Sequence, residues 1–270
     1  MPKDLAQLPK PAVPVDISQA TAVEQARAIA EVRAAVMVAQ ECPRDLARAF
    51  ADMRDTCRTQ HLADRAFYRV PNRGQGPSVH LARELARVWG NIDYGVRELR
   101  RDDAAGVSEV LAFAWDVQTN SRSSRTFVVP HQRMVKGARV NLTDLGDVYL
   151  NNQNVGARAV RECIWSVLPV SFVEEAEATC RETLRGGGGK PLAQRVDDMV
   201  AAFARLHVTV EAIEAKLGRK RDVWDADDVA TMTVVWQSVQ RGDITVGDEF
   251  GGAAPVSAAS FAPTLDGAES

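Results

Sequence analysis

Three consecutive strand-like segments between residues 91 and 133 constrain the fold of this chain more than any other feature. The first segment, NIDYGVRELRR, ends at the turn DDAAG. The second, VSEVLAFAWDVQT, has apolar residues at alternate positions: Val107, Leu111, Phe113, Trp115 and Val117. The third, RSSRTFVVPHQR, follows a turn at Asn120. Period-two segments joined by short polar turns predict an antiparallel β-meander.

Helical patterns lie on both sides of the meander. A long one starts near Thr21, and a second follows Pro43. AFYRVP is expected to be a short strand and NRGQG a turn, and PSVHLARELARVW is expected to be a helix with Pro77 in its first turn. A further helix runs to Pro169 and another reaches the glycine run at 186. We therefore expect an α+β fold, in which an antiparallel β-meander packs on helices, with a small all-helical C-terminal unit.

Changes in composition along the chain suggest five segments. We expect a flexible N-terminal tail at 1–21, a core at 22–185, a Gly-rich linker at 186–190, a helical C-terminal domain at 191–250 and a disordered tail at 251–270. In the helical domain, Gly218 is typical of a C-cap, and Asp225 with Asp228 is typical of an N-terminal cap pair. Trp224, Trp236 and Phe250 are expected to supply most of its core.

The bulk composition is that of a soluble globular protein, with 46% apolar and 26% charged residues. No run of about 18 apolar residues suggests a membrane span. The first residues lack the apolar stretch of a signal peptide. The four cysteines show no CxxC pair, so we expect reduced thiols in the cytosol.

The charge is distributed unevenly, although the net charge is only −3. Residues 54–170 contain 17 Lys and Arg against 12 Asp and Glu, whereas residues 171–270 contain 10 against 17. Of the 17 basic residues, 16 are arginine, which can both fork to phosphate and stack on bases. This asymmetry indicates nucleic-acid contact in the middle of the chain, and chance clustering on solvated faces is the alternative.

Two segments raise the question of phosphate binding. In RGGGGKP (185–191), Pro191 stands where a P-loop needs Ser or Thr, so we expect a linker there. NRGQGPS leads into a helix whose free N–H groups and nearby basic residues favour an extended anion such as a sugar-phosphate strand. A core helix with a solvated basic face is the alternative.

A second basic group surrounds the last strand of the meander and continues into the next helix. Asn154, Arg158 and Arg161 are spaced four and three residues apart, so they share one helix face. Amide and guanidinium groups on one face suit phosphate and sugar oxygens.

Signs of enzymatic chemistry are weak. The four histidines show no metal-ligand spacing such as HExxH. Four carboxylates on the predicted strands keep a metal-dependent nuclease open as an alternative: Asp93, Glu98, Glu109 and Asp116. Glu109 and Asp116 are an odd number of residues apart, which places them on opposite faces of one strand.

Three segments of the core together resemble the phage single-strand annealing proteins of the Erf/RecT/Redβ type. These are GPSVHLARELARVWGNIDYGVREL, VLAFAWDVQTNSRSSRTFVVPHQR and NNQNVGARAVRECIWSVLP. The segment RVDDMVAAFARLHVTVEAIEAKLG, with DVATMTVVWQSVQRGDITVGDEF, resembles the small helical module at the C-terminus of many phage recombination proteins. Together they cover roughly residues 22–250.

The resemblance implies ATP-independent binding of single-stranded DNA and annealing of complementary strands in phage homologous recombination, within a ring or helical filament. It implies no catalytic residue, metal or cofactor, and action in the cytoplasm of a bacterial host. A structural or adaptor protein of a phage replication or recombination complex remains the first alternative. The departure from the family is that arginines stand where Redβ-like proteins use lysines.

The expected partners are single-stranded DNA, the annealed duplex and further copies of the chain, with no membrane. A phage exonuclease or host single-strand binding protein is expected to bind the C-terminal domain. By the residues and the resemblance, the predicted DNA-binding set is Arg65, Arg69, Arg73, His80, Arg83, Arg122, Arg125, Arg133, Lys136, Arg139, Asn154, Arg158 and Arg161.

Overall fold

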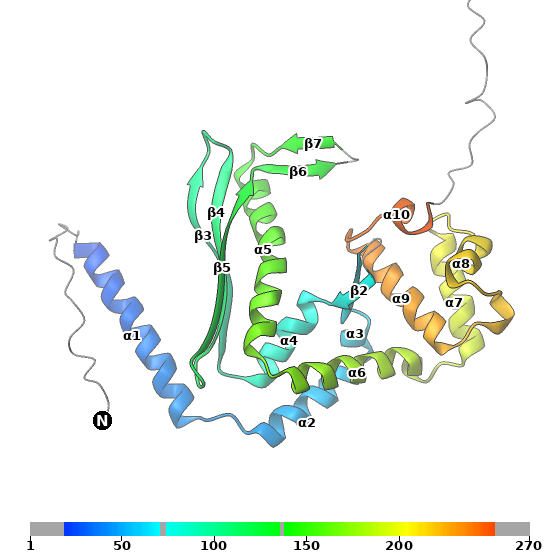
Figure 1. Ribbon diagram of the computed structural model, residues 1–270, viewed down its shortest axis with the longest axis horizontal. Coiled ribbons are helices and arrows are strands. Elements are labelled where there is room, and N and C mark those ends of the chain that lie inside the picture. The colour runs from blue at the N-terminus through cyan, green and yellow to red at the C-terminus, as the bar shows by residue number, and fades with distance from the viewer. Residues whose placement is uncertain (1–18, 71–73, 136–137, 252–270) are drawn as a thin grey trace, which may run out of the picture. The chain divides into compact units, whose positions relative to one another are not determined.

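The computed structural model describes residues 19–70, 74–135 and 138–251, which divide into two units at Pro43. The described part is mixed helix and antiparallel sheet, as the sequence predicts (Figure 1). The elements of the first half of the larger unit are α2 (Leu46–Cys57), α3 (Gln60–Ala63), β1 (Phe67–Val70), β2 (Gly74–Pro77), α4 (Val79–Trp89), β3 (Ile92–Asp102), β4 (Val107–Asp116) and β5 (Ser121–Pro130). The remaining elements are β6 (Gln132–Val135), β7 (Ala138–Asn141), α5 (Leu145–Val167), α6 (Val170–Gly186), η2 (Gly187–Gly189), α7 (Leu192–Ala204), α8 (Val210–Leu217), η3 (Arg221–Val223), α9 (Ala226–Gln240) and α10 (Val246–Phe250).

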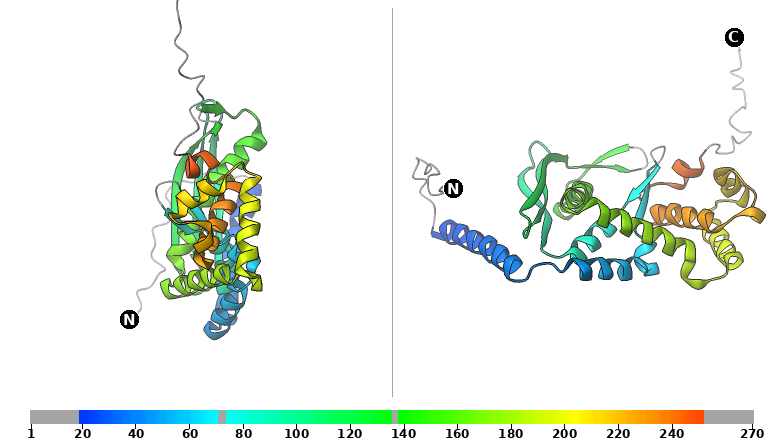
Figure 2. Two further views of the ribbon diagram at one scale, coloured as in Figure 1. Left: turned by 90° about the vertical axis from the view of Figure 1, so that its right-hand side faces the viewer. Right: turned by 60° about the horizontal axis from the view of Figure 1, so that its bottom comes forward.

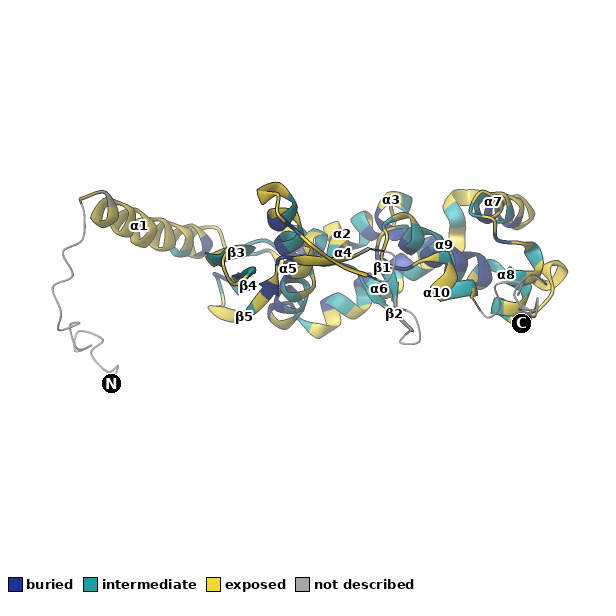
Figure 3. Ribbon diagram, turned by 90° about the horizontal axis from the view of Figure 1, so that it is seen from above, coloured by how far each residue is buried: buried dark blue, intermediate teal, exposed yellow. Residues whose placement is uncertain are grey.

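The smaller unit contributes one long helix, α1 (Gln19–Glu41). Its side chains are exposed along nearly the whole length (Figure 3). Arg27 pairs with Glu24 and Glu31 one turn away on either side. Several large apolar side chains are also exposed: Val23, Ile29, Val32, Met37 and Val38.

The meander forms as predicted, with strand order β3-β4-β5 and antiparallel pairing throughout. Helix α5 runs along one side of this sheet (Figures 1 and 2). α5 ends just before Pro169, as expected. At its start, Asp144 caps the helix by accepting a hydrogen bond from the Asp147 amide. The sheet therefore has one face under a helix and one face away from it.

The face of β4 that packs on α5 is not the one that the apolar alternation suggests. The residues under α5 are the even-numbered ones, such as Val110, Ala112 and Ala114, all fully buried. The Cys163 thiol of α5 reaches the Ala112 carbonyl at 3.7 Å. The small Ala side chains let α5 approach closely, whereas Leu111, Phe113 and Trp115 lie on the opposite face.

Two β-hairpins are present that the sequence analysis missed. β2 pairs with β1 where only a turn was expected, and β6 pairs with β7 where the last meander strand was expected to continue. β5 ends at Pro130, which lacks an N–H for further pairing. Pro77 belongs to β2 rather than to the first turn of α4, and Ser78 caps α4 by accepting from the Leu81 amide at 3.2 Å.

The C-terminal helices form a second hydrophobic cluster around Met199, Phe203, Ile213 and Met232. Gly218 is the αL C-cap of α8, and Asp225 with Asp228 forms a capping box at α9, as predicted. Helix α9 contributes to both clusters and packs against β1 and α6. The glycine run forms the end of α6 and the short turn η2.

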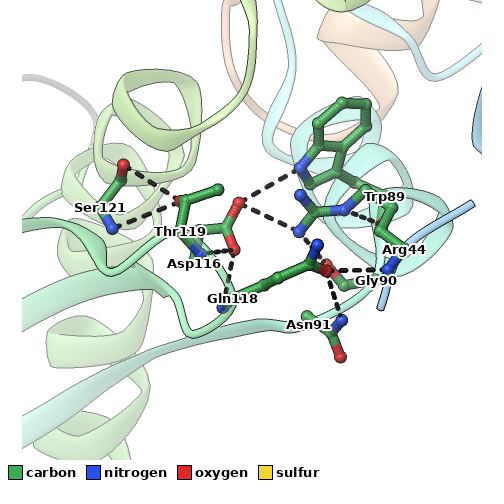
Figure 4. A network of polar contacts seen from close by, with 8 residues as sticks. All are labelled: Arg44, Trp89, Gly90, Asn91, Asp116, Gln118, Thr119 and Ser121. Atoms are coloured by element: carbon green, nitrogen blue, oxygen red, sulfur yellow. Dashed lines mark hydrogen bonds and ion pairs between the residues drawn. The ribbon is translucent and has the colours of Figure 1, made fainter. Parts of the chain in front are cut away.

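A buried ion pair joins three separate segments of the core (Figure 4). The Arg44 guanidinium lies 3.0 Å from the Asp116 carboxylate, and only 5% and 2% of these side chains are exposed. Arg44 also donates to the carbonyls of Trp89 at 2.7 Å and Gly90 at 2.9 Å, and it stacks over the Trp89 ring at 4.4 Å. The chain before α2, the end of α4 and the end of β4 are thereby tied together.

The Asp116→Ala variant should lower the free energy of unfolding by about 3–5 kcal/mol, because it leaves the Arg44 charge buried without its partner. Urea unfolding followed by circular dichroism measures this change. The matched control is Asp93→Ala on the exposed part of β3, which should cost less than about 0.5 kcal/mol. Equal losses in the two variants would contradict the assigned role of the pair.

The Gly156→Ala variant should also be destabilised, because a Cβ at this position would lie 2.6 Å from a methyl carbon of Val96. Overpacking of this kind costs about 1–3 kcal/mol. In a double-mutant cycle, Val96→Ala should recover part of the loss. Gly186→Ala is the control, since a Cβ there meets nothing within 4 Å and the change should be neutral.

Candidate nucleic-acid interface

The outward face of α5 carries the amide and guanidinium groups that the sequence placed together. Residues such as Val148, Gly156 and Val160 are buried on the opposite side, against the sheet. Asn154 and Arg158 are exposed. Asn154 and Arg158 are therefore accessible on this face, whereas only 15% of the Arg161 side chain is exposed.

Arg125 lies beside this face, at the edge of the sheet. It is opposite Ala112 in the β4–β5 register, so it points to the same side of the sheet as α5, and it is exposed. The Asn151 side chain of α5 donates to the Pro130 carbonyl of β5 at 3.1 Å, which identifies the flank of α5 that faces β5. Arg158 is seven residues further along α5 and shares that flank. Arg125 and Arg158 therefore line the same α5–β5 edge.

Further along the helix, α5 meets the β1–β2 hairpin through a cation–π contact. The Arg161 guanidinium lies 4.6 Å from the centre of the Tyr68 ring, and it pairs with Glu162 at 2.9 Å. The Tyr68 ring lies against Gly76 of β2, where a Cβ would come within 3.2 Å of it. We call Arg125, Asn154, Arg158, Arg161 and Tyr68 the α5 strip.

A second group of cations surrounds the start of α4. Burial lowers the pKa of His80 below its ordinary value, and the positive charges of Arg241, Arg83 and Arg65 lower it further, while Asp243 opposes the shift. These groups are therefore near neighbours, and the shift favours the neutral form of the ring. We call Arg65, His80, Arg83 and Arg241 the α4 cluster. A phosphate beside His80 would raise the pKa of the ring and draw a proton onto it.

Arg69 does not join the α5 strip. It neighbours Tyr68 in β1, so its side chain leaves the opposite face of the hairpin. There it forms an ion pair with Glu249 of α10. This predicted DNA-binding residue is therefore engaged by the C-terminal helices in this structure.

The predicted cluster around the last strand is divided. Arg122 is opposite Trp115 and lies on the face of the sheet away from α5, stacked 5.9 Å from the Trp115 ring. Arg133 and Arg139 lie on opposite faces of the β6–β7 hairpin, because Arg133 is opposite Val140 and Arg139 is opposite Met134. Arg133 approaches Asp147 at 3.8 Å. Arg73 and Lys136 lie outside the described residues.

Most cations of the described chain are neutralised by carboxylates, and several predicted DNA-binding residues are not. Within the described residues, no carboxylate forms an ion pair with Arg65, Arg83, Arg122, Arg125, Arg139 or Arg158. By contrast, Arg100 pairs with Asp102 and Arg87 pairs with Glu84 on the surface. Unpaired guanidinium groups keep their charge and their donors free for an external anion.

The carboxylates that kept a nuclease open do not converge. Asp116 is taken by Arg44, and Glu98 pairs with Arg101 at 3.0 Å. Asp93 and Glu109 are exposed on the face of the sheet away from α5. In the β3–β4 register Asp93 is opposite Trp115, whereas Glu109 is opposite Arg100, so the two carboxylates lie at different positions along the strands. In the part of the chain that the structure describes, no group of three or more His, Cys, Asp or Glu is placed to hold a metal ion.

Two contributors to these surfaces were not predicted. Arg241 lies in the segment assigned to a separate acidic domain, but it reaches β1 and donates to the Phe67 carbonyl at 2.8 Å. For Tyr68 the sequence predicts only a place in the short aromatic strand AFYRVP. The aromatic content of AFYRVP beside a glycine-rich turn was the one available signal for Tyr68, and Arg241 had no local signal.

Comparison of the sequence with known protein families and characterised proteins, and of the fold with solved structures, gave no match. Among the described helices, none combines the length and the apolar character needed to cross a membrane.

The double variant Arg125→Ala with Arg158→Ala should weaken binding of an oligo-dT strand about tenfold near 0.1 M salt. The slope of log affinity against log salt should fall by about 1.4, because each lost phosphate contact on a single strand contributes about 0.7. Fluorescence anisotropy over a salt series measures both quantities.

The matched control for this double variant is Arg87→Ala with Arg100→Ala, which removes the same charge from exposed arginines that already have carboxylate partners. Its affinity should change far less. Equal losses in the two double variants would show that only net charge matters and would remove the α5 strip as a specific interface.

Proposed function

We propose that this protein binds single-stranded DNA and anneals complementary strands without ATP, in phage homologous recombination in the cytoplasm of a bacterial host. The observation that carries the proposal is the set of exposed, unpaired arginines around α5 and α4, of which Arg125 and Arg158 share one edge. The resemblance to the annealing proteins of the Erf/RecT/Redβ type supports the same function.

The chemistry of these surfaces suits a backbone ligand better than a base-specific one. Guanidinium and amide groups bind phosphate and sugar oxygens, which carry no sequence information. Two free strands repel each other through their phosphates, and neutralising one backbone lowers that barrier and releases counterions. If the base edges stay free, pairing proceeds without a covalent step, so annealing needs no catalytic residue.

Annealing over useful lengths requires several copies of the chain, because one core spans only a few nucleotides. The exposed apolar residues of α1 support self-association, since an isolated helix with Ile29, Val32 and Met37 in water gains stability by packing on a partner. We propose that copies assemble into a ring or helical filament.

The C-terminal helices offer a surface for a protein partner. A cavity of about 650 Å³ opens beside α7 and α8, lined partly by Leu192, Val196 and Trp224 and partly by charged residues. A cavity lined by both apolar and charged residues suits a ligand that carries both kinds of group, such as a short peptide segment. We propose that a phage exonuclease or a host single-strand binding protein binds there. The same cavity supports the second candidate function, an adaptor in a replication or recombination complex.

Mixing the protein with complementary oligonucleotides, without nucleotide or metal, should accelerate duplex formation well above the protein-free rate. Electron microscopy of the same samples should show rings or filaments that depend on DNA. Unchanged particles and no acceleration would favour the adaptor. In a parallel sample that contains a divalent metal, loss of the strands on a gel would favour the nuclease.

A further inference from the structure

Glu249 of α10 is a nearly buried carboxylate held between two cations. Only 2% of its side chain is exposed. Its Oε1 atom accepts from the Arg69 guanidinium of β1 and lies 2.5 Å from the Lys216 ammonium of α8. Lys216 also donates to the Glu249 carbonyl at 3.4 Å.

In this arrangement the Glu249 carboxylate fills a site formed by two cations, Arg69 and Lys216, that could bind an anion. Burial of a carboxylate is unfavourable unless charged partners compensate for its lost hydration. Here one negative charge faces two positive charges, so the site keeps a net positive charge with Glu249 in place. Without Glu249, a guanidinium and an ammonium would converge on one position, which suits a phosphate oxygen.

The occupant belongs to a short helix, α10. Helix α10 has only five residues, too few to be stable alone. It is held by the capping box of Thr245 and Asp248, by packing of Phe250 on Phe203, and by the Glu249 contacts. α9, which precedes α10, is held more firmly, since Ser238 accepts from the Arg69 amide at 2.9 Å and Arg241 donates to Phe67.

The site borders the surfaces assigned to DNA. Arg69 follows Tyr68 in β1 with its side chain on the other face of the hairpin, and Arg241 of the α4 cluster donates to the Phe67 carbonyl of the same strand. A strand that reached this hairpin would bring phosphates close to Arg69.

We propose that Glu249 acts as an internal competitor of single-stranded DNA, and that a phosphate of the bound strand takes its place beside Arg69 and Lys216. This inference rests on the proposed function. Strand binding and release of α10 are then coupled, so each lowers the free-energy cost of the other.

The Glu249→Gln variant tests the competition, because it keeps the shape of the side chain and removes its charge. Affinity for oligo-dT should rise about three- to tenfold, and the salt dependence should steepen by about 0.7 to 1.4, for one or two additional phosphate contacts. Arg69→Ala should lower affinity more in the Glu249→Gln protein than in the wild type. The matched control is Asp198→Asn, which removes one negative charge from an exposed pair with Lys190 and should leave affinity and slope unchanged.

A second measurement uses the unaltered protein, so its result does not depend on whether a variant folds. Hydrogen exchange of the amides at 246–250 should become faster when oligo-dT is bound, and unchanged or slower exchange would overturn the displacement. If Glu249→Gln binds as the wild type does, while wild-type binding still depends on Arg125 and Arg158, the competitor role alone fails. If the wild type does not bind oligo-dT, the proposed function fails and the competitor role fails with it.

Discussion

The buried pair of Arg44 and Asp116 is the interaction on which the rest of the core depends. A buried ion pair is stable only when the remaining donors and acceptors are also satisfied. Here the second Asp116 oxygen accepts from the amides of Gln118 at 3.1 Å and Thr119 at 3.2 Å, which shape the turn before β5. Since the same network fixes the end of α4, the meander and α4 form one rigid frame. The positions of Arg125 on β5 and of the α4 cluster follow from that frame.

Close packing of α5 on the sheet then determines what its outer face can do. Gly156 leaves room for Val96, and Ala112 and Ala114 present little bulk to the helix. A helix seated this deeply buries residues such as Val148 and Val160 against the sheet and leaves Asn154 and Arg158 exposed. The cations of the α5 strip thus owe their common orientation to small residues that carry no charge themselves. This separates the residues that build the interface from those that would contact a ligand.

Local patterns were enough to predict the meander, the helices and most of their caps. The caps Gly218 and Asp225 and the period-two strands act over a few residues, so their effects can be predicted from short segments. The β1–β2 hairpin was missed because GQG has little strand propensity and is held by its pairing with β1. The buried face of β4 was missed because both faces of this central strand are largely apolar, so alternation cannot decide between them.

The candidate site was predictable only in part, because its composition depends on contacts between distant segments. The spacing of Asn154, Arg158 and Arg161 correctly placed them on one helix face. The pairing of Arg69 with Glu249 joins residues 180 positions apart, and Arg241 reaches Phe67 across 174 positions. Hydrophobic periodicity and charge counts hold no information about such pairs. A count of arginines therefore overstates the charge available to a ligand until the internal ion pairs are known.

The C-terminal helices carry an excess of negative charge, in contrast to the basic middle of the chain. Their cations are mostly neutralised within the unit, as in the pairs of Arg221 with Asp197, of Lys220 with Glu214 and of Lys190 with Asp198. The excess of acidic residues therefore stays uncompensated there, while Arg125 and Arg158 of the α5 strip form no ion pair with a carboxylate of the described residues. A polyanion is repelled by the first surface and attracted by the second, and screening weakens both effects beyond about 8–10 Å at physiological salt. The hairpin of Arg69 and Tyr68 contacts both the core and the C-terminal helices, so in the proposed binding mode its contacts would limit how far a strand extends.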